Sequence, residues 1–231
     1  HEFDEGCGEL ARFMEAAPVP VLAANLAPEE GCPLRGARTA SHIIKKVRGV
    51  KVGIVGLAND KVSTLAAACP HTAFLPAEET LRREVKALEA EGVRHIVAVT
   101  HLGLPEDREL ARSVNGVDVI VGGHTHNYLG PAPSDGPYPI VEHSPDGSPV
   151  LVVTAGRGAK YLGELTVQFD GNGVPSLWSG SAVELTSSMP VDPAVQTLID
   201  HYAATLESLR SEVVGSQALS LPDGMDLCRE D

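Results

Sequence analysis

Alternation of apolar runs with helical patterns restricts the fold more than any other feature of this sequence. Four runs rich in Val, Ile and Ala have the continuous apolar character of strands buried on both faces: 20–25, 51–57, 94–100 and 117–123. Residues 77–92 begin with acidic side chains, carry Leu81, Val85 and Leu88 at helical spacing, and end at Gly92. Strands that alternate with helices build layered α/β folds with largely parallel central strands. We therefore expect an α/β fold whose site lies at the carboxyl ends of its strands.

The sequence changes character after residue 127, where Pro, Gly, Ser and Asp become frequent. Turn-rich stretches there lead to three segments with the pattern of antiparallel strands: 150–156, 162–170 and 175–185. Asp192 then precedes a long apolar stripe at helical spacing, which predicts a capped amphipathic helix. Another strand-and-turn pattern follows it. We expect a domain over 1–190, a linker helix over 191–214, and the start of a second domain, cut short, over 215–231.

Charge excludes two classes of partner. The 231 residues include 18 Lys and Arg against 31 Asp and Glu, so the formal net charge at pH 7 is −13. This charge repels nucleic acids and anionic membranes, and no basic stripe offsets the repulsion. No apolar run approaches the ~18 residues that a membrane span requires. We expect neither a nucleic-acid partner nor a membrane-spanning segment, and the sequence leaves the oligomeric state open.

The four cysteines leave both their pairing and the cellular compartment open. Cys7, Cys32, Cys69 and Cys228 have none of the spacings that close a structural zinc site. An even number permits disulfides and an exported protein, but scattered thiols in a reduced cytosolic protein have the same pattern.

Histidines follow two of the predicted strands at the point where each strand ends. His101 comes directly after the third apolar run, and His124 and His126 follow the fourth in the string GGHTH. In extended backbone, residues two apart project to one side, so His124 and His126 are placed to bind the same ion or adjacent ions. Gly122 and Gly123 would keep Cβ atoms from crowding that approach. Imidazole suits zinc, manganese, iron or cobalt, so the three histidines predict a metal site.

Together these strings resemble the 5′-nucleotidase/UDP-sugar hydrolase branch of the calcineurin-like metallophosphoesterases. The resemblance runs over essentially the whole chain and rests on HEFDEG, PVLAANL, KVGIVGL, VTHLG, GVDVIVGGHTHNYLG, AGRGAKYLGELTVQFD and, after the predicted linker helix, LCRED. It implies an αββα sandwich that carries two divalent metal ions such as Zn²⁺ or Mn²⁺, a connecting helix, and a C-terminal domain that holds the nucleoside. We therefore expect 1–190 to be a metallophosphoesterase domain, incomplete at its amino terminus, and 215–231 to begin a 5′-nucleotidase domain.

The resemblance also implies roles for single residues at the two ends of the chain. His1 and Asp4 match a pair in which the histidine, polarised by the carboxylate, assists charge build-up on the phosphoryl oxygens or the leaving group. Arg229 matches an arginine that lies against the substrate. Cys228 matches one half of a disulfide whose partner would lie beyond Asp231.

The metal ligands follow from the same resemblance. His101 and His124 match ligands of one metal, and His126 matches a ligand of the other. Two cations about 3.5–4 Å apart deliver hydroxide to a phosphate ester and neutralise its oxygens. The family takes the remaining ligands from a D-x-H motif, a GD motif and the Asn just before the catalytic His, none of which lies in this chain. We expect Asn before His1, and we interpret Asp60 and Asp107 as solvated surface carboxylates.

The expected function is hydrolysis of nucleoside 5′-monophosphates by a metal-activated hydroxide, assisted by His1 and Asp4. UDP-sugars, nucleoside di- and triphosphates and 2′,3′-cyclic nucleotides are alternative substrates on the same fold. A second alternative is a non-catalytic binding module whose three histidines hold one metal weakly, and a structural role is the third. We expect the chain by itself to bind metal weakly and to hydrolyse almost nothing. The resemblance implies export to the periplasm or the exterior.

Overall fold

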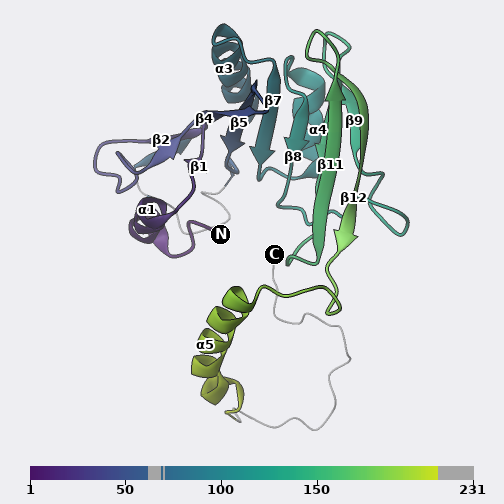
Figure 1. Cartoon of the computed structure of the whole chain (residues 1–231). Coiled ribbons are helices and arrows are strands. Elements are labelled where there is room, and N and C mark those ends of the chain that lie inside the picture. Colours follow the sequence, from purple (N-terminus) through teal and green to yellow (C-terminus); the bar gives the residue numbers. More distant parts are fainter. Residues whose placement is uncertain (62–68, 70, 213–231) are drawn as a thin grey trace. The chain divides into compact units, whose positions relative to one another are not determined.

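The computed structural model of the chain describes residues 1–61, 69 and 71–212 (Figure 1). The chain divides into two compact units, His1–Thr186 and Ser187–Asp231. The second predicted domain, 215–231, lies outside the described residues, as do Cys228 and Arg229. The domain limits predicted near 190 and 214 stay predictions.

A six-stranded sheet forms the centre of the first unit (Figure 1). Its strands lie in the order β4 (His42–Val47), β5 (Val50–Leu57), β7 (His95–Thr100), β8 (Val119–Val121), β10 (Pro149–Val153) and β9 (Ile140–His143). β5, β7, β8 and β10 run parallel, whereas β4 and β9 pair antiparallel at the two edges. The predicted parallel centre is confirmed. The segment 150–156 is expected to be antiparallel. It contains β10, which pairs antiparallel with β9 but parallel with β8, because β8 belongs to the parallel centre of the sheet.

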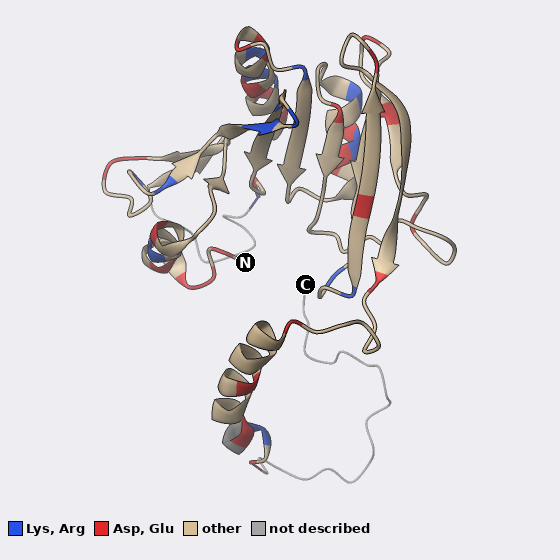
Figure 2. Ribbon diagram, viewed as in Figure 1, with Lys and Arg blue, Asp and Glu red and all other residues tan. Residues whose placement is uncertain are grey.

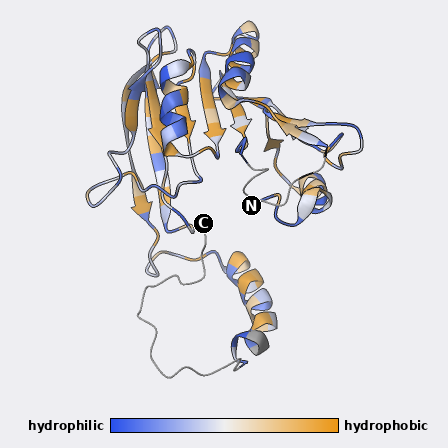
Figure 3. Cartoon of the chain, turned by 180° about the vertical axis from the view of Figure 1, so that it is seen from behind, coloured by the Kyte–Doolittle hydropathy of each residue, from blue (hydrophilic) through white to orange (hydrophobic). Residues whose placement is uncertain are grey.

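Helices α3 (Ala77–Ala90) and α4 (Leu104–Ser113) pack against this sheet, α3 on β5 and α4 on β9 and β10. The predicted stripe of α3 is buried at Leu81, Val85 and Leu88, and such burial stabilises by about 1.5–3 kcal/mol per side chain. A Cβ at Gly53 would lie 2.7 Å from a Leu88 methyl, so the glycine lets α3 approach β5 closely. β7 and β8 contain no Lys, Arg, Asp or Glu (Figure 2). The strands are hydrophobic along most of their length, while α3 is largely hydrophilic on its outer side (Figure 3).

One predicted strand is wrong in its extent. Of residues 20–25, only β1 (Val21–Leu22) is a strand, and it pairs in parallel with β3 (Thr39–Ala40) outside the large sheet. Pro18 and Pro20 have no N–H to offer to a ladder. The buried Asn25 amide bonds the backbone of Ala58 instead, donating to its oxygen at 2.8 Å and accepting from its nitrogen at 2.9 Å.

A smaller core lies beside the sheet, between helix α1 (Gly6–Ala16) and the antiparallel pair β2 (Leu26–Pro28) and β6 (Thr72–Phe74). Its buried members come from four short segments: Phe3, Cys7, Leu10, Met14, Cys32, Leu34 and Cys69. This core holds the first residues of the chain in place.

A long hairpin, β11 (Tyr161–Phe169) and β12 (Pro175–Glu184), completes the first unit and is antiparallel as predicted. A cleft of about 490 Å³ lies between β11 and the large sheet, lined mainly by valines of β5, β7 and β8 and by Leu165, Val167 and Phe169. Of the expected αββα sandwich, the described residues thus contain one large sheet, its helical layer and this hairpin.

In the second unit, helix α5 (Pro193–Arg210) begins where the sequence predicts. The Asp192 carboxylate accepts hydrogen bonds from the backbone nitrogens of Ala194 at 2.8 Å and Val195 at 3.2 Å, which confirms the predicted cap. The apolar stripe of α5 is exposed. None of the helices in the described ranges combines the length and the apolar character needed to cross a membrane.

Candidate active site

The carboxyl ends of β7 and β8 bring two of the predicted metal ligands together. His101 directly follows β7, and His124 lies three residues beyond the last residue of β8. Because these neighbouring strands are parallel, both histidines emerge at the same edge of the sheet. The centroids of their rings are 5.3 Å apart.

The backbone of GGHTH is not extended, so that prediction is wrong. His124 has φ 74° and His126 has φ 57°, both in the left-handed region that residues other than glycine seldom adopt. The reason is Thr125, whose hydroxyl accepts from the Leu104 N–H at 3.0 Å and donates to Asn127 Oδ1 at 2.5 Å. Thr125 therefore ties the loop to the start of α4, and the chain turns at each histidine. Strained backbone of this kind concentrates at functional sites.

His126 is not brought into one group with the other two histidines. Among the residues that the structure describes, the only three His, Cys, Asp or Glu side chains whose ligand atoms all lie within 4.8 Å of one another are cysteines. The structure thus places the His101 and His124 rings close together and leaves His126 on the following turn, outside any such group of three.

The two glycines of the loop make room for the His101 ring and for a carboxylate, rather than for an approach to His124 and His126. A Cβ at Gly123 would lie 3.0 Å from His101 Nδ1. A Cβ at Gly122 would fall on the carboxylate of Asp107. The two glycines of the loop therefore allow a histidine and a carboxylate to pack directly against the end of β8.

The surroundings of His101 favour a neutral imidazole. Burial lowers its pKa, the electrostatic effect of the neighbouring His124 lowers it further, and the nearby carboxylate of Glu2 opposes both effects. A neutral imidazole is the form that binds a metal ion. The donor chemistry of the His101 and His124 pair, and the lowered pKa of His101, therefore fit a divalent cation.

The predicted His1 and Asp4 pair is formed. His1 Nδ1 and Asp4 Oδ2 are hydrogen-bonded at 2.8 Å, in a turn in which the Asp4 N–H donates to the His1 carbonyl at 3.0 Å. The His1 side chain is 96% exposed. Phe3 anchors the segment by packing edge-on against Phe74, with ring centroids 5.4 Å apart. Because Glu2 also acts on the pKa of His101, the turn lies within electrostatic range of the histidine pair.

Asp107 is not a solvated surface carboxylate, and that interpretation is wrong. The residue is 1% exposed, and its Oδ1 accepts a hydrogen bond from Thr100 Oγ1 at 2.6 Å. Burial raises its pKa to about 7, although the Thr100 hydroxyl opposes the shift. Its Oδ2 has no hydrogen-bond partner among the described residues. One carboxylate thus lies beneath both strand ends that lead to His101 and His124.

A signal for Asp107 is present in the sequence. Leu104, Asp107, Leu110 and Ala111 are the buried residues of α4 and recur at helical spacing. Read with that period, Asp107 belongs to the apolar face of a helix rather than to a loop. Asp60, by contrast, is half-buried. Arg229, predicted to contact substrate, lies outside the described residues.

Comparisons with known proteins find similar sequences and similar folds over nearly the whole chain. A 5′-nucleotidase of Diplobatis ommata is 34% identical over 237 residues, covering 99% of this chain and 41% of that protein. The crystal structure of a 5′-nucleotidase precursor from Thermus thermophilus matches with a TM-score of 0.87 at 38% identity, covering 93% of this chain and 43% of that chain. A calcineurin-like phosphoesterase from Bacillus subtilis matches with a TM-score of 0.69 over 91% of this chain and 70% of its own, and at 21% identity it shows the fold alone.

The chain spans less than half the length of the curated relatives it matches. No protein-family model matches it.

Proposed function

Because the chain belongs to the 5′-nucleotidase family, within the calcineurin-like metallophosphoesterases, we propose that the full-length protein is a metal-dependent hydrolase that releases phosphate from nucleoside 5′-monophosphates. The observation that carries the proposal is that the turn of the His1 and Asp4 pair lies within electrostatic range of His101, whose ring centroid is 5.3 Å from that of His124. The His101 and His124 pair suits a cation, and the His1 and Asp4 pair suits proton transfer.

His101 and His124 would hold one divalent ion, zinc or manganese, and His126 would contribute to a second. Ions bound there would activate water and neutralise the charge of the phosphate ester. Gly123 keeps the His101 ring close to the loop, and Thr125 fixes the turn between the two strained histidines.

Asp4 orients the His1 ring through the hydrogen bond to Nδ1. With Nδ1 bonded to the carboxylate at 2.8 Å, the other ring nitrogen would donate to a phosphoryl oxygen or to the leaving group. The exposure of His1 is consistent with a group that meets substrate from solution.

The Cys7–Cys69 disulfide supports export, because such bonds persist in the periplasm and outside the cell. We further propose that α5 links this domain to a nucleoside-binding domain, in which Arg229 contacts the substrate.

Phosphate release from AMP tests the proposal, measured with added Zn²⁺ or Mn²⁺ for the chain alone and for a form extended by its flanking sequence. The extended form should be active and the chain alone nearly inactive, because no carboxylate of the described residues joins both histidines in a group whose ligand atoms all lie within 4.8 Å of one another. UDP-glucose, ADP, ATP and a 2′,3′-cyclic nucleotide serve as competing substrates. Metal binding without turnover of any of them would favour a non-catalytic binding module.

Variants of the extended form assign the residues. His124→Ala should abolish metal-dependent release, and His1→Gln should lower turnover by about 10²–10⁴-fold. His143→Ala is the matched control, since His143 is exposed on the edge strand β9. Full activity of His124→Ala would contradict the metal assignment, and full activity of His1→Gln would contradict the role of the His1 and Asp4 pair.

A further inference from the structure

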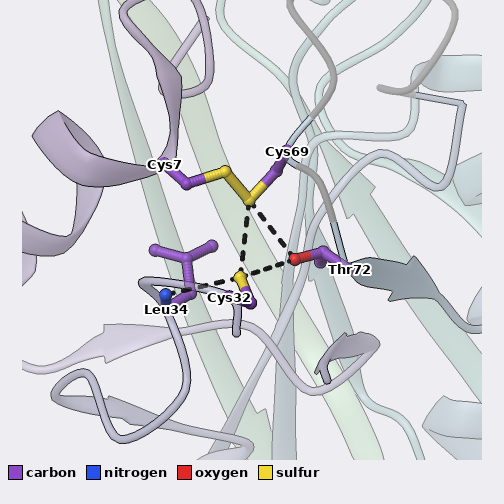
Figure 4. The surroundings of a disulfide bond; sticks show 5 residues. All are labelled: Cys7, Cys32, Leu34, Cys69 and Thr72. Carbon is purple, nitrogen blue, oxygen red and sulfur yellow. Dashed lines mark hydrogen bonds between the residues drawn. A yellow bond between two sulfur atoms is a disulfide. The ribbon is translucent and has the colours of Figure 1, made fainter. Parts of the chain in front are cut away.

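Three cysteines from separate segments meet in the smaller core of the first unit (Figure 4). Cys7 and Cys69 form a disulfide with Cα atoms 5.4 Å apart, and Cys32 is a buried free thiol. All three sulfurs lie within 4.8 Å of one another. A free thiol therefore shares a closed space with a disulfide.

Cys32 is aimed at one sulfur of that disulfide. Its Sγ lies 3.6 Å from Cys69 Sγ, which is contact distance for two sulfur atoms that are not bonded. The Thr72 hydroxyl lies 2.9 Å from the Cys32 sulfur and donates to the Cys69 sulfur at 3.3 Å (Figure 4). The Leu34 N–H donates to the Cys32 sulfur at 3.4 Å.

The backbone fixes Cys32 in this position. Its N–H donates to the Glu29 carbonyl at 3.2 Å, and its carbonyl accepts from the Arg35 N–H at 3.0 Å. With the backbone bonded on both sides and the sulfur in contact with the Thr72 hydroxyl and the Leu34 N–H, the thiol is held beside the disulfide.

We infer that Cys7, Cys32 and Cys69 form a thiol–disulfide exchange site in which Cys32 displaces Cys7 from Cys69. The Cys32 thiol loses its proton, and its sulfur forms a bond to Cys69 Sγ. The bond between Cys7 and Cys69 breaks, and the Cys7 sulfur leaves with the electron pair and takes up a proton. One disulfide forms as another breaks, so the exchange requires neither an oxidant nor a reductant.

The exchange frees the start of α1 from its covalent link. Cys7 lies three residues after Asp4, and the disulfide and the Phe3–Phe74 contact together hold the segment that contains His1 and Asp4. Loss of the disulfide leaves that segment held by packing alone. This consequence for hydrolysis rests on the proposed function, whereas the exchange itself does not.

Disulfide mapping tests the exchange without an enzymatic assay. The full chain carries Cys228→Ser, so that the three clustered cysteines are its only cysteines, and is held at mildly alkaline pH over minutes to hours, the timescale of uncatalysed rearrangement. Thiols are then blocked with N-ethylmaleimide and the peptides are mapped. We expect two populations: Cys7–Cys69 with labelled Cys32, and Cys32–Cys69 with labelled Cys7.

Two variants make the result decisive. Both are made in the Cys228→Ser chain. There, Cys7→Ser should form the Cys32–Cys69 disulfide under mild oxidation, whereas Cys32→Ser should show Cys7–Cys69 alone. The inference is overturned if the Cys228→Ser chain keeps a single disulfide and Cys7→Ser keeps both remaining thiols free.

Amide hydrogen exchange measures the effect on α1. The amides of α1 should exchange about ten- to a hundredfold faster in Cys7→Ser than in Cys32→Ser, because only the latter keeps the link to Cys69. Equal exchange in the two variants would contradict the release of α1. In the extended form, Cys7→Ser should also lower AMP turnover relative to Cys32→Ser, and equal turnover would contradict the link to hydrolysis. If the disulfides interchange but no form releases phosphate, the proposed function fails and the exchange stands.

Discussion

Single residues under the ends of β7 and β8 have almost no room for change. Gly123 contacts the His101 ring, and Gly122 lies against the Asp107 carboxylate, which in turn accepts from Thr100. Each of these contacts joins α4 to a strand end or one strand end to the next. The position of the histidines therefore depends on residues that are not themselves predicted metal ligands.

Gly122→Ala tests this packing. Its new methyl group would collide with the buried Asp107 carboxylate, so we expect a loss of about 1–3 kcal/mol in the free energy of unfolding. Gly171→Ala is the matched control, because no atom lies within 4 Å of the added Cβ. Urea unfolding measures both, and equal stability of the two variants would contradict the close contact.

Asp118 gives the stability of the protein a defined pH dependence. Burial raises its pKa from 3.8 to about 7, although its Oδ2 accepts from the Ile96 N–H at 2.7 Å. Between these two values the folded state holds a proton that the unfolded state has released. Stability from this group is therefore complete below pH 3.8 and is lost as the pH rises toward 7.

Asp118→Asn should flatten that dependence, because the amide stays neutral. The variant should avoid a loss in the free energy of unfolding of at most about 1.4 kcal/mol for each pH unit between pH 3.8 and about 7. Asp107 has the same sign and the same window, so the slope should decrease rather than disappear. Denaturant unfolding at several pH values measures the slope, and an unchanged slope would show that Asp118 ionises normally.

At the scale of elements, long periodic patterns predicted the structure and single polar side chains altered it. Apolar residues at helical spacing predicted α3, and continuous apolar runs predicted β5 and β7. The stretch 20–25 is mostly irregular because Asn25 bonds Ala58, a contact 33 residues away that no local pattern contains. The turn in GGHTH depends in the same way on Thr125 and the distant start of α4. The sequence thus predicted that His101 and His124 meet, but neither the separate position of His126 nor the backbone that carries the histidines.

Two glycines of α1 should respond in opposite directions to the same substitution. Gly8 is exposed within the helix with open space around it, so Gly8→Ala should stabilise the protein by about 0.5–1 kcal/mol. Gly6 has φ 80°, so Gly6→Ala should destabilise by about 1–2 kcal/mol. Thermal unfolding followed by circular dichroism compares them, and shifts of the same sign would contradict a helix that begins at Gly6.

At the scale of the whole molecule, apolar surface and net charge oppose one another. In the second unit, the stripe of α5 is at least half exposed at five positions: Val195, Leu198, Ile199, Tyr202 and Leu206. Contiguous apolar surface of this kind favours association. The net charge of −13 resists it, and salt screens that repulsion.

We therefore expect the chain to associate with rising concentration, more strongly at high salt. Leu198→Glu should shift sedimentation toward the monomer, whereas Gln196→Glu, which adds the same charge at another position on the same helix, should not. A chain that sediments as a monomer at every concentration and salt level would contradict this expectation.

The Cys7–Cys69 bond also closes residues 7–69 into a covalent ring. The 62-residue separation of the two cysteines encloses β1 to β5, including two strands of the large sheet. Closing a ring of this size lowers the conformational entropy of the unfolded chain and so stabilises the folded state by about 4 kcal/mol. A protease that cuts once inside the ring would leave its two products joined until a reductant separates them. After the exchange the ring begins at Cys32 instead, so a cut within α1 releases the amino-terminal peptide with no reductant, and a non-reducing gel distinguishes the two forms.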